Sequence, residues 1–529
     1  MHRTPNWRLT AVAVVTLLAV AAIGARAGRS ASAGAAHANA STLVDGTTDT
    51  VTNIDPAGEY DYGTFTLDLP LFQGLYTYAP GAKLKPLLAT GCKSSPNQTT
   101  WTCALRKGVK FSDGSAFDSS DVKFTFDRVT NKSVVKQAGA NTPSSLLANL
   151  KSVSTPSPYV VVFHLKTPQS TWPLILSTSA GFIVSKDTYA PDSLRSNTDS
   201  QVGTGPYELV KFTPGQQAVL QANPNYWGPA PKTSSVIVNY YTKSSTMKLA
   251  LQQGEIDMAY IDFTPTEYAS LAKTKGIRVY EGNGVRIRYL VFNVARAPGN
   301  NIAVRRAVAY LMPRQTIATR IYHGLVKPLY SQVPAGLPGH IDAFKSVYGA
   351  TPSVAKAKAV LAKAGVTTPV PMEIWYTPTH YGDASADEYA EIQRALNSSG
   401  LFKVTLKTAE WAQYVGTLGN TYNVFQLGWY PDYVDAEDYT IPFFATGNFL
   451  ANGYSSPAMD ALVKKEHEAR TTAVRLAVIR SMQVLQAKDV PTIPYWQGKM
   501  LVVGRSNVHG IPSTLDAAVY LRFWLISKS

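Results

Sequence analysis

Alternating apolar and polar residues predict a β-hairpin within residues 203–228. Residues 208–212 and 218–221 alternate with a period of two and contain residue types that favour strands. A Thr-Pro-Gly sequence joins the two runs, and a Pro-Gly pair favours a tight turn. Asn and Pro residues at 223–225 then end the second run. This region therefore predicts two antiparallel strands connected by a short turn.

The same periodicities predict further elements along the chain, because strands repeat every two residues and helices every 3.6. In the helix predicted last, Val474, Val478, Met482 and Leu485 share one face. Pro313 is expected to kink or restart its helix, because proline has no amide hydrogen to donate. Strands are predicted at 159–165, 181–185, 236–241, 286–293, 372–376, 403–407 and 424–429, and helices at 64–76, 302–321, 353–364, 386–396, 459–470 and 473–488.

The first 40 residues have the composition of an export signal. Basic residues precede an apolar run at 9–25, and A-x-A sequences end at Ala27 and at Ala40. This order is typical of a signal peptide with two candidate cleavage sites. The apolar run is also just long enough for an uncleaved membrane anchor. No cysteine follows it before Cys92, so lipid anchoring through an N-terminal cysteine is not expected.

Length and charge narrow the class of protein. A chain of 529 residues is long enough for three or more domains or lobes. Its formal net charge is +15, and it is +11 from Ser41 onward, because four of the 50 Lys and Arg residues and no acidic residue precede that position. The basic residues are dispersed, with no zinc-finger cysteine pattern, so nucleic-acid binding is not expected. Sequence motifs of serine hydrolases, zinc proteases, P-loop and dinucleotide-binding enzymes are absent.

The only two cysteines of the chain, Cys92 and Cys103, lie close together in sequence. An exported chain enters an oxidising compartment, so we expect them to form a disulfide. A bridge over a loop of this length stabilises a fold by about 3 kcal/mol in the chain-entropy model. Two sulfurs without a nearby histidine leave a zinc site incomplete.

Five separate motifs give the chain a specific resemblance. They are GTGPYELV…NPNYWG within 203–228, WTCALRKGVKFSDG…DVKFTFDR at 101–128, GEID at 254–257, VRRA at 304–307 and PTIP at 491–494. Together they resemble the family 5 extracellular solute-binding proteins, the receptors of dipeptide, oligopeptide and nickel ABC importers. The resemblance extends over roughly residues 43–525. The chain departs from the family at Pro313-Arg314, where relatives usually carry Asp-Arg.

The resemblance implies an α/β fold with two lobes, like the class II periplasmic binding proteins, and an extra subdomain in lobe one. The chain is expected to cross between the lobes near Gly282 and near Pro491. The implied division is a signal peptide at 1–40, lobe one at 41–70, 201–282 and 491–529, the extra subdomain at 71–200, and lobe two at 283–490.

Residues 428–439, GWYPDYVDAEDY, concentrate acidic and aromatic side chains. The order of acids and glycine in an EF-hand is absent, so a calcium loop is not expected. A carboxylate pair of a glycosidase is conceivable, but sequence fixes no separation between carboxyls. Asp432 and Trp429 are also compatible with a helix cap and a core tryptophan. Asp435 is expected to face solvent.

In peptide-binding relatives the corresponding strand ends in Gly-Trp-x-x-Asp-Tyr-x-x-Pro, and its acid pairs with the peptide α-ammonium. Gly428, Trp429, Asp432 and Tyr433 match, whereas Ala436 stands where proline is usual. The resemblance therefore implies that Asp432 anchors a cationic ligand end, with Trp429 as an apolar contact. The full set of candidate ligand-binding residues is Asp432, Trp429, Gly428, Tyr430, Tyr433, Tyr60, Tyr62, His380, Tyr381 and Trp496.

The function implied is that of an extracytoplasmic binding protein, not an enzyme, which captures peptides between two lobes for an ABC importer. No cofactor, metal or nucleic acid is expected, and the protein is expected to be a monomer. Its expected partners are a small peptide and the membrane complex of ABC permease and ATPase. Two alternatives stay open: an oligosaccharide receptor of the same fold, and a secreted hydrolase that uses the cluster around Asp432.

Overall fold

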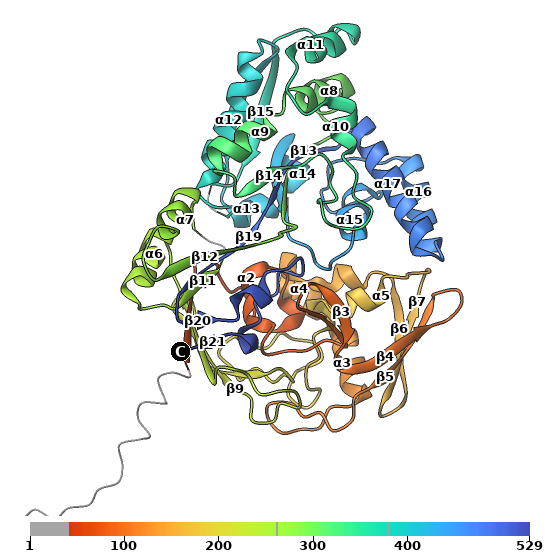
Figure 1. Ribbon diagram of the computed structural model, residues 1–529. Coiled ribbons are helices and arrows are strands. Elements are labelled where there is room, and N and C mark those ends of the chain that lie inside the picture. The colour runs from red at the N-terminus through yellow and green to blue at the C-terminus, as the bar shows by residue number, and fades with distance from the viewer. Residues whose placement is uncertain (1–41, 261–262, 379) are drawn as a thin grey trace, which may run out of the picture. The chain divides into compact units, whose positions relative to one another are not determined.

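Two large β-sheets organise the molecule (Figure 1), whose computed structural model describes residues 42–260, 263–378 and 380–529. The predicted signal peptide lies outside the described residues. Each of the two large sheets is accompanied by helices. The α/β, two-lobed fold is therefore confirmed. Within the described part of the chain, no helix combines the length and the apolar character that crossing a membrane requires.

Lobe one is built on a seven-stranded sheet with mixed strand directions. Its first strand, β1, runs parallel to both β10 and β11, while β9 pairs antiparallel with β8 and β10. β8 and β9 are the hairpin predicted from the alternating pattern. The strand order is β12 (Ile277–Gly282), β19 (Met500–Arg505), β11 (Met258–Tyr260), β1 (Thr42–Thr47), β10 (Ser235–Tyr240), β9 (Gln217–Ala222) and β8 (Tyr207–Thr213). The helices associated with this sheet are α6 (Ser244–Gln253) and α7 (Pro265–Leu271).

A smaller antiparallel sheet lies between β1 and β8 in sequence, and α3 packs on it. Asp118 and Asp121 form a capping box at the start of α3. Near the end of α3, Arg128 donates two hydrogen bonds to the buried Asp55, at 2.7 and 2.5 Å. This pair fixes the segment that leads to Tyr60. The strand order is β4 (Ala89–Ser94), β5 (Thr100–Leu105), β7 (Val160–Leu165) and β6 (Leu150–Ser157), with helices α3 (Ser119–Val129), α4 (Lys132–Ala138) and α5 (Trp172–Ile175).

Lobe two is built on a six-stranded sheet that is also mixed. Its helices surround the sheet, and α16 and α17 run side by side (Figure 1). The strand order is β14 (Val326–Pro328), β18 (Thr492–Gly498), β13 (Ile287–Phe292), β17 (Val424–Trp429), β15 (Val370–Tyr376) and β16 (Phe402–Thr408). The helices are α8 (Ile302–Leu311), α9 (Arg314–Thr316), α10 (Ala343–Tyr348), α11 (Val354–Lys363), α12 (Ala384–Ser398), α13 (Trp411–Val415), α14 (Leu418–Thr421), α15 (Ile441–Phe444), α16 (Pro457–Glu468) and α17 (Thr472–Asp489).

The chain passes between the two large sheets twice. The first passage follows β12 and ends at β13, close to the expected crossing at Gly282. The second lies at Lys499, between β18 and β19, rather than near Pro491. The difference arises because β18 pairs with β13 and β14 and so completes the sheet of lobe two before the chain leaves it. The complete division into lobes and subdomain remains a proposal.

Two local predictions are wrong. The helix expected at 64–76 is limited to α2 (Tyr62–Asp68), because Pro70 has no amide hydrogen to donate and cannot continue the helical hydrogen bonding. The chain then forms the hairpin of β2 (Tyr76–Ala79) and β3 (Lys83–Pro86). Residues 181–185 form no strand; the amide of Ile183 donates to the Gln73 carbonyl, and that of Val184 to the Thr125 hydroxyl. These hydrogen bonds satisfy the buried backbone amides of the segment without pairing to another strand.

The predicted break at Pro313 is confirmed, because α8 ends at Leu311 and a new helical segment starts at Arg314. The apolar face predicted for α17 is only partly right. Val474 is 54% exposed, whereas Met482 and the polar Gln483 are fully buried. Gln483 is buried at low cost because its amide donates to a backbone carbonyl and its oxygen accepts from a serine hydroxyl.

Candidate functional site

Two segments far apart in the sequence meet where the lobes contact each other, and we call this the interlobe junction. It is formed by residues 59–62 of lobe one and residues 428–434 of lobe two. The phenol of Tyr60 donates a 2.9 Å hydrogen bond to a carboxylate oxygen of Asp432. Nearby, the hydroxyl of Tyr78 accepts a hydrogen bond from the Val434 amide. The structure therefore brings together Tyr60 and Asp432, two of the residues selected from sequence.

Asp432 lies just beyond the end of β17, and its backbone is fixed by another acid. The Asp432 amide and the Trp429 indole both donate to one carboxylate oxygen of Asp438, at 3.1 and 2.9 Å. The Trp429 ring packs edge-on against Phe443 at 5.0 Å. Asp438 is fully buried, and its second carboxylate oxygen has no partner among the described residues. This arrangement holds the Asp432 side chain at the junction.

Three acidic side chains, those of Glu59, Asp432 and Asp438, lie at the junction. Burial raises the pKa of Asp432 to about 7. Burial, and then the neighbouring Asp432, raise the pKa of Asp438 well above its usual range. Glu59 is also buried, and burial raises its pKa, with further contributions from Asp61 and Asp432. Among the described residues, no lysine or arginine forms a salt bridge with Glu59, Asp432 or Asp438. A cation placed here would therefore stabilise their ionised forms.

A second contact of the junction consists of two stacked tyrosine rings, one of which is hydrogen-bonded to an arginine. The rings of Tyr62 and Tyr430 are stacked with centroids 4.7 Å apart. The hydroxyl of Tyr430 accepts a 3.2 Å hydrogen bond from Arg286, which precedes β13. The hydroxyl of Tyr62 donates to that of Tyr260 at 2.6 Å. Tyr60 and Tyr62 thus contact Asp432 and Tyr430 respectively, so four of the candidate residues lie together at the junction.

Gly428 serves a packing role beside the junction. It lies opposite Arg288 in the β13–β17 pair, and a Cβ at this position would lie 1.8 Å from a guanidinium nitrogen of Arg288. The guanidinium lies over the Tyr381 ring at 3.6 Å, and the Tyr381 hydroxyl accepts from the Gly428 amide. Only glycine leaves space for Arg288 at this point.

The remaining candidates lie in different environments. His380 is exposed and stacks on Trp411, with ring centroids 3.6 Å apart. Tyr433 is buried. Trp496 is 1% exposed, and its indole donates to the buried Glu388 at 2.6 Å, so it supports the sheet behind the arginines instead of presenting a surface. Sequence reasoning did not select Glu59, Arg286, Arg288 or Tyr78; the Arg-Ile-Arg sequence inside an otherwise apolar strand is the signal that would have indicated the arginines.

The expectation that Asp435 faces solvent is wrong. Both of its carboxylate oxygens accept from Arg475 of α17, which also contacts Glu437 and Glu466. Glu437, Glu466 and His467 have ligand atoms within 4.8 Å of one another. Because the Arg475 guanidinium forms salt bridges with Asp435, Glu437 and Glu466, the cluster is a structural ion network, which joins α16 and α17 to the segment after Asp432.

The predicted disulfide between Cys92 and Cys103 is present and links β4 to β5, where the two residues are direct cross-strand partners. The bridge lies in the small sheet, and its Cys103 end is buried. The Cys92 amide donates to the Tyr76 hydroxyl, which is not part of the interlobe junction. Its role is therefore structural.

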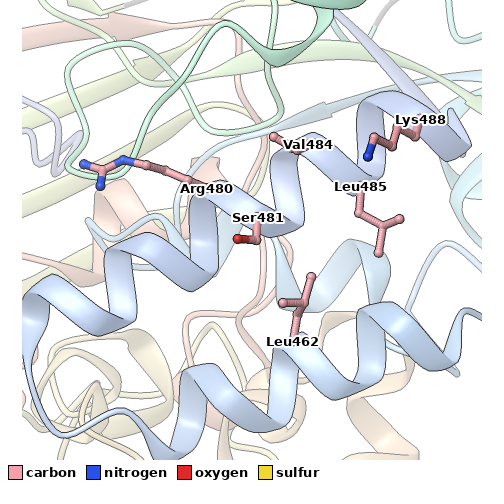
Figure 2. A pocket seen from close by; sticks show the side chains of 6 residues that line it. All are labelled: Leu462, Arg480, Ser481, Val484, Leu485 and Lys488. Atoms are coloured by element: carbon pink, nitrogen blue, oxygen red, sulfur yellow. The ribbon is translucent and has the colours of Figure 1, made fainter.

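An open groove of ≈ 400 Å³ lies away from the junction, between α16 and α17. Figure 2 shows Leu462 and Leu485 pointing toward each other across it, and Arg480 directed away from it. Its other lining residues are Ser481, Val484 and Lys488. The groove contains no carboxylate and no aromatic side chain, so it offers nothing that would recognise a cationic ligand.

Known solute-binding proteins resemble this chain over most of its length. The family model described as "Bacterial extracellular solute-binding proteins, family 5 Middle" matches residues 83–450. The chain is 26% identical over 475 residues to the glutathione-binding protein GsiB of Salmonella typhimurium, covering 87% of this chain and 89% of that protein. It is 28% identical over 393 residues to the probable D,D-dipeptide-binding periplasmic protein DdpA of Escherichia coli K12, covering 72% and 73%.

A solved structure shares the fold. The periplasmic binding protein DppA from Helicobacter pylori, in complex with the peptide STSA, matches with a TM-score of 0.80 and 24% sequence identity. The match covers 92% of this chain and 98% of that one. At this identity the likeness shows the architecture, and the ligand has to be argued from the residues of the junction.

Proposed function

Because the chain belongs to the family 5 bacterial extracellular solute-binding proteins, we propose that it captures small peptides outside the cytoplasm and delivers them to an ABC importer. The family is one of binding proteins, and the chain is proposed to have no catalytic role. The proposed partners are a peptide ligand and the membrane complex of permease and ATPase. The protein is proposed to act as a monomer.

The position of Asp432 carries the proposal. Its carboxylate lies at the contact between the lobes, close to two further buried acids, and among the described residues its side chain is paired with a phenol instead of a cation. A buried carboxylate favours a positively charged partner, which restores the interaction lost with water. The α-ammonium of a peptide supplies that charge. The names of GsiB, DdpA and the STSA complex, which all refer to peptides, support the same ligand class.

The junction also supports ligand capture by lobe closure. Tyr60 and Tyr62 belong to lobe one, whereas Asp432 and Tyr430 belong to lobe two. A ligand that contacts both groups stabilises the arrangement in which the lobes are together. The two passages of the chain, at 283–286 and at Lys499, are the connections about which such a movement would occur.

The ligand class is tested by mass spectrometry of what the purified protein carries. Native spectra followed by denaturation should release one or more peptides with free amino termini. Calorimetry with pooled dipeptides and tripeptides should then show saturable binding. Release of an oligosaccharide, with no heat from any peptide pool, would contradict the proposal.

A further inference from the structure

The helix α17 of lobe two carries apolar residues on its outer side as well as on its inner side. Ile479 and Met482 are fully buried and pack into the core of the lobe. Val474 and Val484 of the same helix are 54% and 39% exposed. A helix that only covers its own lobe needs one apolar stripe, with polar residues on the opposite face. The second set of apolar residues therefore indicates a contact surface for another molecule.

The outer side of α17 has the residue spacing of a coiled-coil seam. Alternating intervals of three and four residues place side chains on one line along a helix, where they pack against a second helix. Five exposed residues of α17 follow this spacing, and we call them the outer seam: Val474, Ala477, Ser481, Val484 and Lys488. At 1.5 Å per residue the outer seam extends over about 21 Å of the helix axis. This length fits a partner helix of several turns.

The outer seam borders the groove between α16 and α17. Leu462 and Leu485 point toward each other across this groove of ≈ 400 Å³ (Figure 2), and Val484 also lines it. In the middle of the outer seam, Ala477 is small, and the Ser481 hydroxyl is already bonded to the Ala477 carbonyl at 3.1 Å. Small side chains allow a second helix to approach closely. The surface therefore suits a helix whose apolar side chains enter the groove.

The charges along this surface are positive. Arg480 and Lys488 are exposed, and within the part of the chain that the structure describes neither forms a salt bridge. They are about 12 Å apart along the helix axis. Arg306 adds a cation at the end of α17, where its guanidinium donates to the Lys488 carbonyl. The acid at this end, Asp489, accepts from the Tyr454 hydroxyl. A partner with carboxylates beside its apolar residues would be attracted here, and a basic one repelled.

Two other occupants fit this surface less well. A second copy of the chain would bring its own basic residues against those of the first, and like charges oppose that contact. An anionic membrane would attract the cations, but helices that lie on membranes present bulky residues such as Trp, Phe and Leu. The outer seam presents valine, alanine and serine instead. The spacing, the groove and the charges together favour a helix of another protein.

We propose that the outer seam and the groove beside it form a docking site for an acidic amphipathic helix of a partner protein. The apolar residues of that helix recur at intervals of three and four, and its carboxylates lie beside them and pair with Arg480 and Lys488. The inference is independent of the proposed ligand. The site lies away from the interlobe junction, so a ligand and the partner helix can be bound at the same time.

The test measures binding of a designed helical peptide to the secreted protein by fluorescence anisotropy. The peptide has about 20 residues, enough to be helical in isolation. It carries leucine and alanine at the a and d positions of its heptads and glutamate at e and g, where the like charges also keep it from pairing with itself. A control peptide has lysine in place of glutamate. Wild type should bind the glutamate peptide saturably, at least about tenfold more tightly than the lysine peptide, and less tightly as salt is raised.

Substitutions on α17 separate a specific site from a generally adhesive surface. Val484→Glu places a carboxylate in the apolar groove and should weaken binding of the glutamate peptide at least about tenfold. Because Val484 is on the surface, the unfolding midpoint should not change. Val354→Glu alters another exposed valine of lobe two, 47% exposed on α11, and should leave binding unchanged. Arg480→Glu combined with Lys488→Glu should reverse the preference, so that the lysine peptide binds more tightly.

Several outcomes would overturn the proposal. These are the absence of saturable binding of the glutamate peptide to wild type, and equal binding by wild type and Val484→Glu. If the protein instead sediments with vesicles rich in phosphatidylglycerol and Val484→Glu does not, the surface contacts membranes. If wild type forms a dimer in sedimentation equilibrium that Val484→Glu lacks, the surface joins two copies of the chain. Peptide transport is unaffected by any of these results, so the proposed function is tested separately.

Discussion

The hydroxyl of Tyr60 and the carboxylate of Asp432 are joined by a 2.9 Å hydrogen bond, although 372 positions separate the two residues in the chain. The bond connects lobe one to lobe two. Because Asp432 lies among buried acids, this contact identifies the place where a cationic group of a ligand would be stabilised most strongly.

Ligand affinity should depend on pH. The pKa of Asp432 is raised to about 7 by burial, so the carboxyl is largely protonated below that pH. An α-ammonium stabilises the ionised carboxylate, so binding releases a proton and affinity rises as pH increases through about 7. Calorimetry with a free peptide at pH 5.5 and pH 8 should show weaker binding at the lower pH. The dependence should vanish in Asp432→Asn, and an unchanged slope in that variant would assign the titration to another group.

Replacing Arg475 by methionine should destabilise lobe two. Arg475 forms salt bridges with Asp435, Glu437 and Glu466, of which the last two are buried. Removing one partner of a buried ion network typically costs about 3–5 kcal/mol, because the remaining charges stay desolvated. Urea unfolding of the variant should show a lowered midpoint. Arg470→Met, at an exposed position that follows α16, is the matched control and should leave the midpoint nearly unchanged.

The disulfide should be complete in the secreted protein and should stabilise the small sheet. Thiol titration of denatured, unreduced protein should find no free thiol, because Cys92 and Cys103 are bridged. Replacing both cysteines by serine should lower the free energy of unfolding of this region by about 3 kcal/mol. Two free thiols in the untreated protein would refute the bridge, and an unchanged unfolding midpoint would refute its contribution to stability.

Ligand should favour the arrangement in which the lobes are in contact. Small-angle scattering should give a smaller radius of gyration with a saturating peptide than without it, because the contacts of Tyr60 and Tyr62 with lobe two hold only when the lobes are together. Tyr62→Ala removes the stacking on Tyr430 and should reduce the change. Identical scattering profiles with and without peptide would contradict closure on binding.

Local features of this fold were predictable from sequence, because their causes are local. The Pro-Gly turn of the hairpin and the break at Pro313 depend on residues next to each other in the chain. The helix expected through Pro70 was wrong, because the apolar stripe was weighted above the break that proline, which lacks an amide hydrogen, imposes on a helix. The strand expected at 181–185 was wrong. The buried amides of this segment donate to a side-chain hydroxyl and to a backbone carbonyl, and do not pair with a neighbouring strand.

The candidate site was predictable only in part. Asp432, Tyr60 and Tyr62 came from family motifs, and the structure brings them together. Arg286 was not selected, because its contact at the junction is with Tyr430, which lies 144 positions away in the chain. Asp435 was expected to face solvent, and its pairing with Arg475 depends on how α17 packs. Such roles depend on packing between residues that are far apart in the chain, and sequence patterns do not reveal that packing.

The most direct test of the account is a calorimetric titration of wild type and Asp432→Asn with peptides that have a free or an acetylated amino terminus. Wild type should bind the free peptides, and the variant should bind them with a loss of about 2–5 kcal/mol, roughly 30- to several thousand-fold in Kd. Acetylation should weaken binding to wild type by a similar factor and add little in the variant. If Asp432→Asn binds free peptides as tightly as wild type, Asp432 does not anchor the ligand and the central claim is wrong.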